Sequence, residues 1–217
     1  MKLFLTSAGL PPETTEEFLK LLVKKPEETK VCFIATASHP EENKWYVEKD
    51  KERLLELGFK ITELDLKEEN ENSLTDKLKD FDVIFVEGGN TFYLLKYVRE
   101  SGFDKALKLF LERGGIYLGV SAGTIITGPN IDTAWWKYGE PSKNKVGIRD
   151  LTGLNLVPFL TAVHINEANV AIIRSYAGKS SYKVVALTDN QAILVQNGEY
   201  KLVGEGEKYV FNTNVKL

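Results

Sequence analysis

In the first two-thirds of the chain, short apolar runs alternate with longer amphipathic stretches, and this alternation limits the possible folds more than any other feature. The apolar runs are rich in β-branched and aromatic residues and predict strands, which we expect at residues 2–9, 30–38, 60–66, 82–89 and 115–121. The stretches between them predict helices, which we expect at residues 13–25, 41–58, 91–100 and 103–114. Strands joined by such long crossovers pair in parallel. The pattern predicts an α/β fold with a doubly wound, mostly parallel sheet that helices cover on both faces.

The last third of the chain has a different pattern. We expect a loop-rich insertion at residues 129–153 and a helix at residues 169–176. Three β-rich runs follow, at residues 182–189, 191–198 and 200–206. Asn197 and Gly198 are typical of a tight hairpin turn between the last two runs. Near the N-terminus, Thr14 and Glu17 fit a capping box that would start the first helix. Because there is no repeat, linker or low-complexity segment, we expect one domain over residues 1–217.

Composition and charge argue against several classes of function. The chain has 217 residues, of which 43% are hydrophobic and 27% charged, and its net charge is −3. Because Lys and Arg are spread along the chain, nucleic acid is not an expected partner. The N-terminal apolar stretch is too short for a signal peptide, and no run is long enough to span a membrane, so we expect a cytoplasmic protein without a membrane partner. The single cysteine, Cys32, lies in an apolar run and is expected to be a packing residue.

A Gly-x-Ser-x-Gly motif directly follows the apolar run that ends at Val120. The motif consists of Gly119, Ser121 and Gly123, and a helix is expected to begin after the serine. A sharp turn from strand to helix exposes such a serine, and the glycines avoid steric clashes. A serine nucleophile also needs a base and an oxyanion site, and the backbone N–H of Ala122 is a candidate oxyanion donor. The alternative is a small-residue turn without a chemical role.

The segment EGGN, residues 87–90, lies at the end of another expected strand. Carboxyl ends of parallel strands share the edge of the sheet where ligands bind. Because Gly88 and Gly89 permit close backbone approach, this segment is a candidate for the second oxyanion donor and for substrate contact. A phosphate-binding loop is a weaker alternative, since the segment lacks the further glycines and the Lys-Ser/Thr ending of such loops. Asn90 and Thr91 are candidates for substrate binding and equally for capping of the next helix.

A general base has to come from one of only two histidines. His164 follows an apolar run and precedes a polar turn, a position that suits an imidazole at a sheet edge. His39 precedes a proline near an expected helix start and is expected to have a structural role. The acid that orients a catalytic histidine usually comes from a separate element. This favours Asp189, at the end of a β-rich run, with Glu167 and Asp132 as alternatives.

In combination, these motifs resemble those of the dipeptidase E and cyanophycinase family of serine peptidases. The resemblance rests on FVEGGNTFYLL, GVSAGT, a histidine about forty residues later and ALTDNQAILV, and it covers nearly the whole chain. It implies the flavodoxin-like layout of class I glutamine amidotransferases, with a C-terminal β-hairpin region. It also implies that Ser121, His164 and Asp189 act as nucleophile, base and acid, in this chain order. Gly89 and Ala122 are the implied oxyanion donors, and no metal or organic cofactor is needed.

The resemblance implies a serine peptidase that hydrolyses short peptides, as a monomer or a homodimer. Dipeptidase E enzymes act on dipeptides with N-terminal aspartate and carry an aspartate, linked to activity, in the loop after the serine. Trp136 lies at that position, so a preference for N-terminal aspartate stays open, and Arg149 and Arg174 are candidates to bind an acidic side chain. The stretch around Trp135 is a candidate pocket lining, flap or dimer contact. A hydrolase of other amides or esters, and a non-catalytic binding protein, are the alternative functions.

Overall fold

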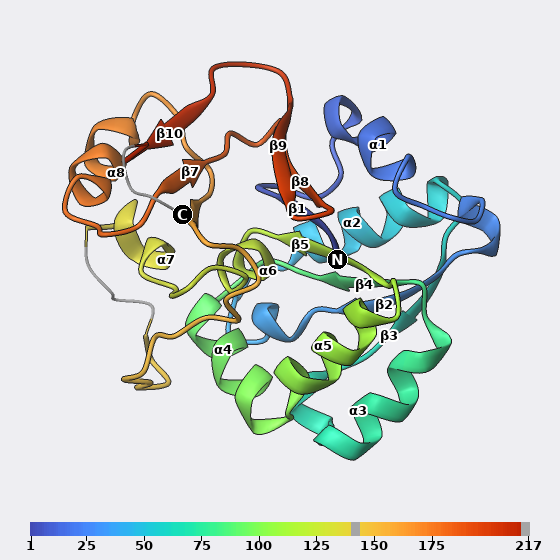
Figure 1. Cartoon of the computed structure of the whole chain (residues 1–217). Helices are drawn as coiled ribbons and strands as arrows, with labels where there is room; N and C mark the ends of the chain where they lie inside the picture. Colours follow the sequence, from blue (N-terminus) through green and yellow to red (C-terminus); the bar gives the residue numbers. More distant parts are fainter. Residues whose placement is uncertain (140–143, 214–217) are drawn as a thin grey trace.

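The computed structural model describes residues 1–139 and 144–213. Within them the chain forms a seven-stranded sheet in the order β3-β2-β4-β5-β1-β8-β9 (Figure 1). The parallel strands are β1 (Lys2–Thr6), β2 (Lys30–Ile34), β3 (Lys60–Glu63), β4 (Val83–Val86) and β5 (Ile116–Val120). The antiparallel strands β8 (Gln191–Gln196) and β9 (Glu199–Gly204) extend the sheet beyond β1. The predicted mostly parallel sheet and C-terminal hairpin are confirmed.

Helices cover both faces of this sheet. One face packs against α1 (Pro12–Leu19) and α2 (Trp45–Glu56). The other face packs against α3 (Glu71–Lys77), α4 (Thr91–Glu100) and α5 (Phe103–Glu112), which lie together in the lower part of Figure 1. Short 3₁₀ turns lie at Pro26–Glu28, Thr36–Ser38, Leu66–Glu68 and Leu78–Asp80.

Strand β2 illustrates how the apolar runs serve both faces. Val31 and Phe33 belong to the core under α1 and α2, whereas Cys32 and Ile34 belong to the core under α3, α4 and α5. All four side chains are fully buried, as expected when successive side chains of a strand point to opposite covered faces. Cys32 is therefore a packing residue, as its position in an apolar run predicts.

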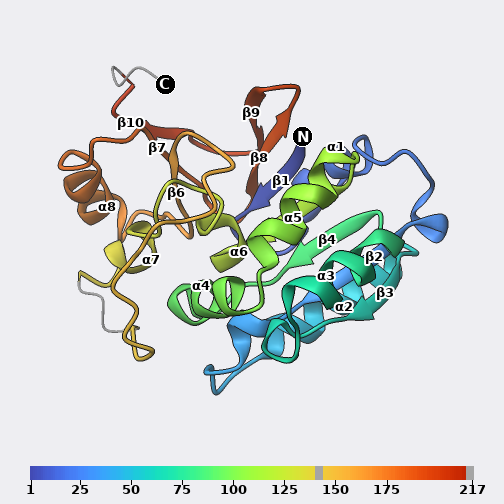
Figure 2. The same ribbon diagram turned by 60° about the horizontal axis from the view of Figure 1, so that its bottom comes forward.

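A smaller, three-stranded sheet lies beside the carboxyl ends of the parallel strands (Figure 2). It contains β6 (Leu160–Ala162), β7 (Val184–Ala186) and β10 (Tyr209–Phe211) in the order β10-β7-β6. Two helices, α7 (Thr133–Trp136) and α8 (Val170–Ala177), complete a separate hydrophobic core around it. Strands β6 and β7 pair in parallel, and this pairing determines which residues meet at the edge that faces the larger sheet.

The first helix differs from its prediction. α1 ends at Leu19, so the predicted helix extends too far. The capping box predicted from Thr14 and Glu17 is wrong, because Pro11 is the N-cap and Pro12 is the first helical residue. A proline side chain cannot accept the capping hydrogen bond, and the Thr14 hydroxyl instead donates to the Pro11 carbonyl inside the first turn.

The helices of the described residues are short. The longest, α2, has 12 residues, and the helix predicted after the Gly-x-Ser-x-Gly motif is the single turn α6 (Ala122–Ile125). Among the residues that the structure describes, no helix has both the length and the hydrophobicity needed to cross a bilayer.

Candidate active site

Ser121 lies at a sharp turn between β5 and α6, at the carboxyl edge of the parallel sheet. Its backbone φ of 47° and ψ of −101° are outside the regions that non-glycine residues usually adopt. The two glycines of the motif allow the chain to pack tightly around this turn. A β-carbon on Gly119 would lie 2.6 Å from the Gly123 carbonyl oxygen, and one on Gly123 would collide with the Val86 carbonyl. The result is a strained turn that presents the serine at the sheet edge.

His164 and Asp189 reach Ser121 from the smaller sheet. Ala162 of β6 pairs in parallel with Ala186 of β7, so the residues that follow these two strands emerge side by side. His164 Nε2 lies 3.0 Å from Ser121 Oγ, and His164 Nδ1 lies 2.6 Å from Asp189 Oδ1. The three side chains therefore form one continuous chain of hydrogen bonds.

The backbone of His164 is also constrained. Its φ of 58° is unusual for a non-glycine residue. The side-chain amides of Asn166 and Asn169 donate to the His164 carbonyl oxygen over 3.3 and 2.8 Å. The His164 N–H donates to Ser7 Oγ over 2.8 Å. These bonds hold the imidazole in the orientation that faces Ser121.

Ser7 is a site residue that the sequence pattern did not predict. It follows β1, the neighbour of β5, and its side chain is fully buried. Besides accepting the His164 N–H, its hydroxyl donates to Asp189 Oδ1 over 2.8 Å and lies 3.4 Å from His164 Nδ1. The available signal was its place in TSAG at the end of the first strand, on the edge where EGGN and GVSAG also end.

The ionised form of Asp189 is stabilised by its neighbours. The hydrogen bond with His164 lowers the pKa of the Asp189 carboxyl, against the opposing effect of burial, and the Ser7 hydroxyl and the charge of Lys137 lower it further. The carboxyl is therefore ionised at neutral pH and can stabilise a positive charge on the imidazole.

Two backbone N–H groups near Ser121, those of Gly89 and Ala122, are candidate oxyanion donors. Within the described part of the chain, neither Gly89 nor Ala122 donates its N–H to a hydrogen bond. Gly89 has a φ of 132°, and a β-carbon there would collide with the Ala37 carbonyl, so the position requires glycine. Gly88 contacts the serine itself, since a β-carbon on Gly88 would lie 3.1 Å from Ser121 Cβ. The N–H groups of Gly89 and Ala122 therefore remain available as hydrogen-bond donors in the described structure.

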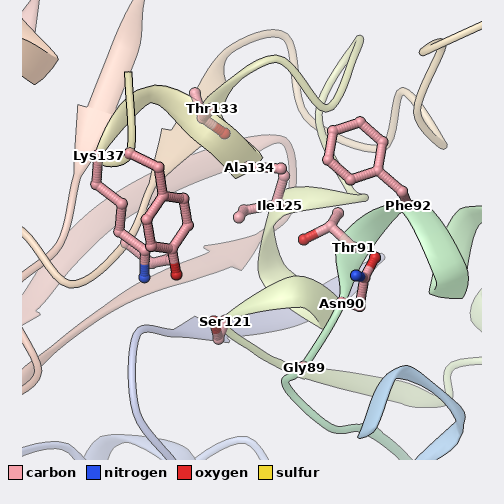
Figure 3. A pocket seen from close by; sticks show the side chains of 11 residues that line it. Gly89, Asn90, Thr91, Phe92, Ser121, Ile125, Thr133, Ala134 and Lys137 are labelled. Atoms are coloured by element: carbon pink, nitrogen blue, oxygen red, sulfur yellow. The ribbon is translucent and has the colours of Figure 1, made fainter. Parts of the chain in front are cut away.

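A small cavity of about 40 Å³ opens beside Ser121 (Figure 3). Asn90 and Thr91 line one side, at the start of α4, and Lys137 lies on the other. The Asn90 side chain also accepts the Tyr93 N–H and caps α4. Capping and cavity lining thus coincide at Asn90.

A larger cavity of about 330 Å³ adjoins the other side of Ser121. Its lining includes Ser7, Glu87, Lys137, His164 and Asp189. Lys137 lines both cavities, which makes it the best-placed cation for a substrate carboxylate.

Several candidates from the sequence lie elsewhere. His39 is exposed, with its Nε2 3.4 Å from Asp65. Glu167 is exposed in a turn and has no contact with His164 in the described residues. Arg149 is exposed outside both cavities, and Arg174 lies over the Phe211 ring. Neither arginine is therefore placed to bind a substrate carboxylate beside Ser121.

Residues of the predicted insertion lie in different places, some in the core of the smaller sheet and some beside Ser121. Asp132 and Trp135 line a separate cavity of about 320 Å³ beside α8. Trp136 is almost fully buried and stacks on Tyr176 within the core of the smaller sheet. The tryptophans therefore support the smaller sheet, while Lys137 lines the two cavities beside Ser121.

The chain resembles known proteins over most of its length. The model of peptidase family S51 matches residues 3–203. An uncharacterized peptidase of Listeria monocytogenes is 38% identical over 174 residues, 78% of this chain and 83% of the relative. Peptidase E of Shigella flexneri is 28% identical over 185 residues, 76% of this chain and 72% of the relative.

Solved structures agree with this similarity. A crystal structure described as a peptidase E protein from Listeria monocytogenes EGD-e has a TM-score of 0.82 and 32% identity, and the match covers 94% of this chain and 98% of that chain. A peptidase from an acI-B1 actinobacterium shares the fold, with a TM-score of 0.70 at 15% identity over 97% of this chain and 90% of that chain.

Proposed function

Because the chain belongs to peptidase family S51 and is therefore a serine peptidase, we propose that it hydrolyses short peptides through an acyl-enzyme on Ser121. The observation that carries this proposal is the continuous hydrogen-bonded chain from Ser121 through His164 to Asp189. A serine hydroxyl becomes an effective nucleophile only when an adjacent base accepts its proton and a third group orients that base.

In the first step, Ser121 Oγ attacks the carbonyl carbon of the scissile amide while His164 Nε2 accepts the hydroxyl proton. The carbonyl oxygen becomes an oxyanion that accepts hydrogen bonds from the N–H groups of Gly89 and Ala122. Removing one such donor typically costs about 100- to 1000-fold in rate. The Asp189 carboxylate stabilises the positive imidazolium that forms.

In the second step, the protonated His164 gives its proton to the leaving amine, the C–N bond breaks, and the acyl group stays on Ser121 as an ester. Water then attacks the ester carbonyl and gives a proton to His164. The ester C–O bond breaks, His164 returns the proton to Ser121 Oγ, and the peptide fragment leaves as a carboxylic acid. Every proton is exchanged through His164, so the mechanism needs no cofactor.

The size and charge of the two cavities support a short substrate. The larger cavity, at about 330 Å³, is at the lower end of the range of small-molecule sites and suits a substrate of dipeptide size. Lys137 lines both cavities and would pair with a carboxylate, either the C-terminus of a dipeptide or an N-terminal aspartate side chain.

A substrate panel tests the proposal. It contains dipeptides Xaa-Ala, the corresponding amino-acid amides and the corresponding ethyl esters, with Asp-Ala and Asn-Ala as a matched pair for the carboxylate. We expect wild type to hydrolyse dipeptides and Ser121→Ala to lose activity by several orders of magnitude while it stays folded by circular dichroism. Hydrolysis of esters alone, or dipeptide hydrolysis retained by Ser121→Ala, contradicts the proposal.

A further inference from the structure

Glu87 places a carboxyl group where the core of a sheet is usually apolar. It directly follows β4, its side chain is completely buried, and it lines the larger cavity beside Ser121. Its Oε1 accepts the N–H of Gly88 over 2.6 Å, and its carboxyl interacts with the neighbouring carboxyl of Asp50. Its Oε2 makes no hydrogen bond of standard geometry in residues 1–139 and 144–213. Burying a polar atom without a hydrogen bond costs free energy, so Oε2 is a candidate to bind a polar group of a ligand.

Two further polar groups face the same cavity from α2. Asp50 and Tyr46 are four residues apart and therefore lie on one face of the helix. The Asp50 carboxyl is almost fully buried against Gly9, where a β-carbon would collide with it. The Tyr46 hydroxyl is buried and, like Glu87 Oε2, makes no hydrogen bond of standard geometry within the described chain. The cavity wall thus holds three oxygen acceptors close together.

Both carboxyls bind a proton more strongly than an isolated carboxyl does. Burial raises the pKa of Asp50 to about 6. Burial, and next the charge of Asp50, raise the pKa of Glu87 well above its ordinary value. A positive charge between them would replace the proton as the group that neutralises the pair.

A primary ammonium group is the chemistry that fits these acceptors. It has three N–H donors and one positive charge, which correspond to the three oxygens and to the acidic character of the pair. A carboxylate or phosphate could not neutralise the two carboxyls once they ionise, and an apolar group would leave the buried oxygens unpaired. The Lys49 ammonium lines the same cavity, yet burial still raises the pKa of Asp50, so a further cationic group would stabilise the pair.

On the premise of the proposed function, we propose that Glu87, Asp50 and Tyr46 form a subsite for the α-ammonium group of the N-terminal residue of the peptide substrate. Gly88, the residue after Glu87, packs beside Ser121, because a β-carbon on Gly88 would lie 3.1 Å from Ser121 Cβ. In a substrate, the α-ammonium nitrogen is two bonds from the scissile carbonyl carbon of the first peptide bond. Binding of this group at Glu87 brings that carbonyl to Ser121 and restricts the enzyme to peptides with a free N-terminus.

The test compares Ala-Ala with N-acetyl-Ala-Ala, which differ in the charge of the N-terminus. In wild type, we expect acetylation to lower kcat/KM by about 100-fold, the value of a hydrogen bond to a buried charged group. Glu87→Gln keeps the acceptor for the Gly88 N–H and removes the negative charge. This variant should lose about 100-fold on Ala-Ala and little on the acetylated peptide. Equal hydrolysis of both peptides by wild type, or an undiminished preference in Glu87→Gln, overturns the proposal.

Tyr46→Phe separates substrate binding from folding. The hydroxyl has no partner in the described chain, so its removal should leave the thermal midpoint unchanged or higher. We expect KM for Ala-Ala to rise about 10-fold, since one acceptor is lost, and KM for the acetylated peptide to stay constant. Glu56→Gln, at an exposed position of α2, is the control for a lost negative charge and should change neither value. A Tyr46→Phe enzyme with wild-type KM on both peptides contradicts the proposed subsite.

A side-chain ammonium is the other possible source of the same chemistry. N-acetyl-Lys-Ala and N-acetyl-norleucyl-Ala isolate it, because both lack the α-ammonium. We expect wild type to treat them alike. A strong preference for the lysyl peptide that disappears in Glu87→Gln overturns the assignment to the α-ammonium and assigns the subsite to a lysine side chain.

Equilibrium binding makes the subsite testable apart from catalysis. Ser121→Ala protein is titrated by calorimetry with Ala-Ala and N-acetyl-Ala-Ala. Preferential binding of Ala-Ala that is lost in the Ser121→Ala/Glu87→Gln double variant supports the subsite, even if wild type hydrolyses no peptide and the proposed function fails. Equal affinity for the two peptides overturns the subsite and leaves the proposed function untouched.

Discussion

At the scale of single residues, Ser7 links the acid to the base. Its hydroxyl donates to Asp189 and accepts the backbone N–H of His164, so it holds both groups in place. We expect Ser7→Ala to lower kcat by about 10- to 100-fold with little change in KM, because a small misplacement of His164 affects the chemical step. Steady-state kinetics measures the two values separately.

Ser101→Ala is the matched control for this prediction. Ser101 is a buried serine at the end of α4, away from both cavities, and its hydroxyl donates only to the Val98 carbonyl in the described structure. It should keep the wild-type kcat. If Ser7→Ala also keeps the wild-type kcat, Ser7 does not position His164.

Asp189 and Glu167 were both candidates for the acid that orients His164, and they differ in the structure. Asp189 Oδ1 lies 2.6 Å from His164 Nδ1, whereas Glu167 is exposed and is not a partner of the imidazole in the described residues. We expect Asp189→Asn to lower kcat by about 100- to 10,000-fold, because the amide no longer favours the correct imidazole tautomer. Glu167→Gln should have wild-type kinetics. The opposite ranking of the two variants would show that Glu167 is the orienting acid.

The sequence anticipated residues that stand in a recognisable motif or are scarce. Ser121 stands in a five-residue motif after an apolar run, and only two histidines could serve it. Ser7, Asp50 and Glu87 were not anticipated, because nothing local distinguishes a buried carboxyl or hydroxyl from an exposed one. Their burial depends on strand order and on the packing of α2, which are properties of the assembled fold.

At the scale of structural elements, the turn between β5 and α6 depends on close backbone contact. A β-carbon on Gly123 would collide with the Val86 carbonyl of the neighbouring strand. We expect Gly123→Ala to lower the free energy of unfolding by about 1–3 kcal/mol, the usual cost of overpacking a tight interior, as measured by urea denaturation. Gly178→Ala is the control, since its nearest neighbours lie 3.5 Å or more away, and it should be neutral or stabilising. Equal stability of the two variants would contradict the tight turn.

The elements that the sequence predicted correctly are those with strong periodicity. The five parallel strands and helices α2, α4 and α5 combine apolar runs with clear ends. The polar helix α3 was missed because it buries one apolar side chain, Leu74, and begins with an Asn70/Ser73 capping box. Strand β10 was missed because its three residues become a strand only by pairing with β7.

At the scale of the whole molecule, the buried acids make stability depend on pH. The pKa of Asp50 is about 6, above the ordinary aspartate value of about 3.9, and that of Glu87 is also raised. Between about pH 4 and pH 6, Asp50 keeps its proton in the folded state but releases it in the unfolded state. The free energy of unfolding should therefore fall as pH rises from about 4 through 6. The hydrogen bond with Glu87, and next the charge of Lys49, oppose the effect of burial on the pKa of Asp50.

Asp50→Asn tests this pH dependence. The variant has no proton to lose at this position, and its Glu87 has no charged carboxyl beside it. Urea denaturation between about pH 4 and pH 7 should therefore give a shallower decrease in stability for Asp50→Asn than for wild type. Parallel decreases for the two proteins would mean that Asp50 does not carry the raised pKa.

The candidate site joins two sheets that the sequence pattern did not separate. The larger sheet carries Ser7, Gly89 and Ser121 at the ends of adjacent strands, and the smaller sheet carries His164 and Asp189 after β6 and β7. Ser121 and His164 therefore meet only when both sheets are folded and packed side by side, in the arrangement that Figure 2 shows.

The central claim is that Ser121 is a nucleophile activated by His164, and covalent labelling tests it most directly. The folded protein is treated with a fluorophosphonate, and the modified residue is located by peptide mass spectrometry. We predict a single adduct on Ser121 that forms in parallel with the loss of dipeptide hydrolysis, is absent in Ser121→Ala, and forms far more slowly in His164→Ala. Full inactivation with Ser121 unmodified, or labelling that is equally fast in His164→Ala, would contradict the claim.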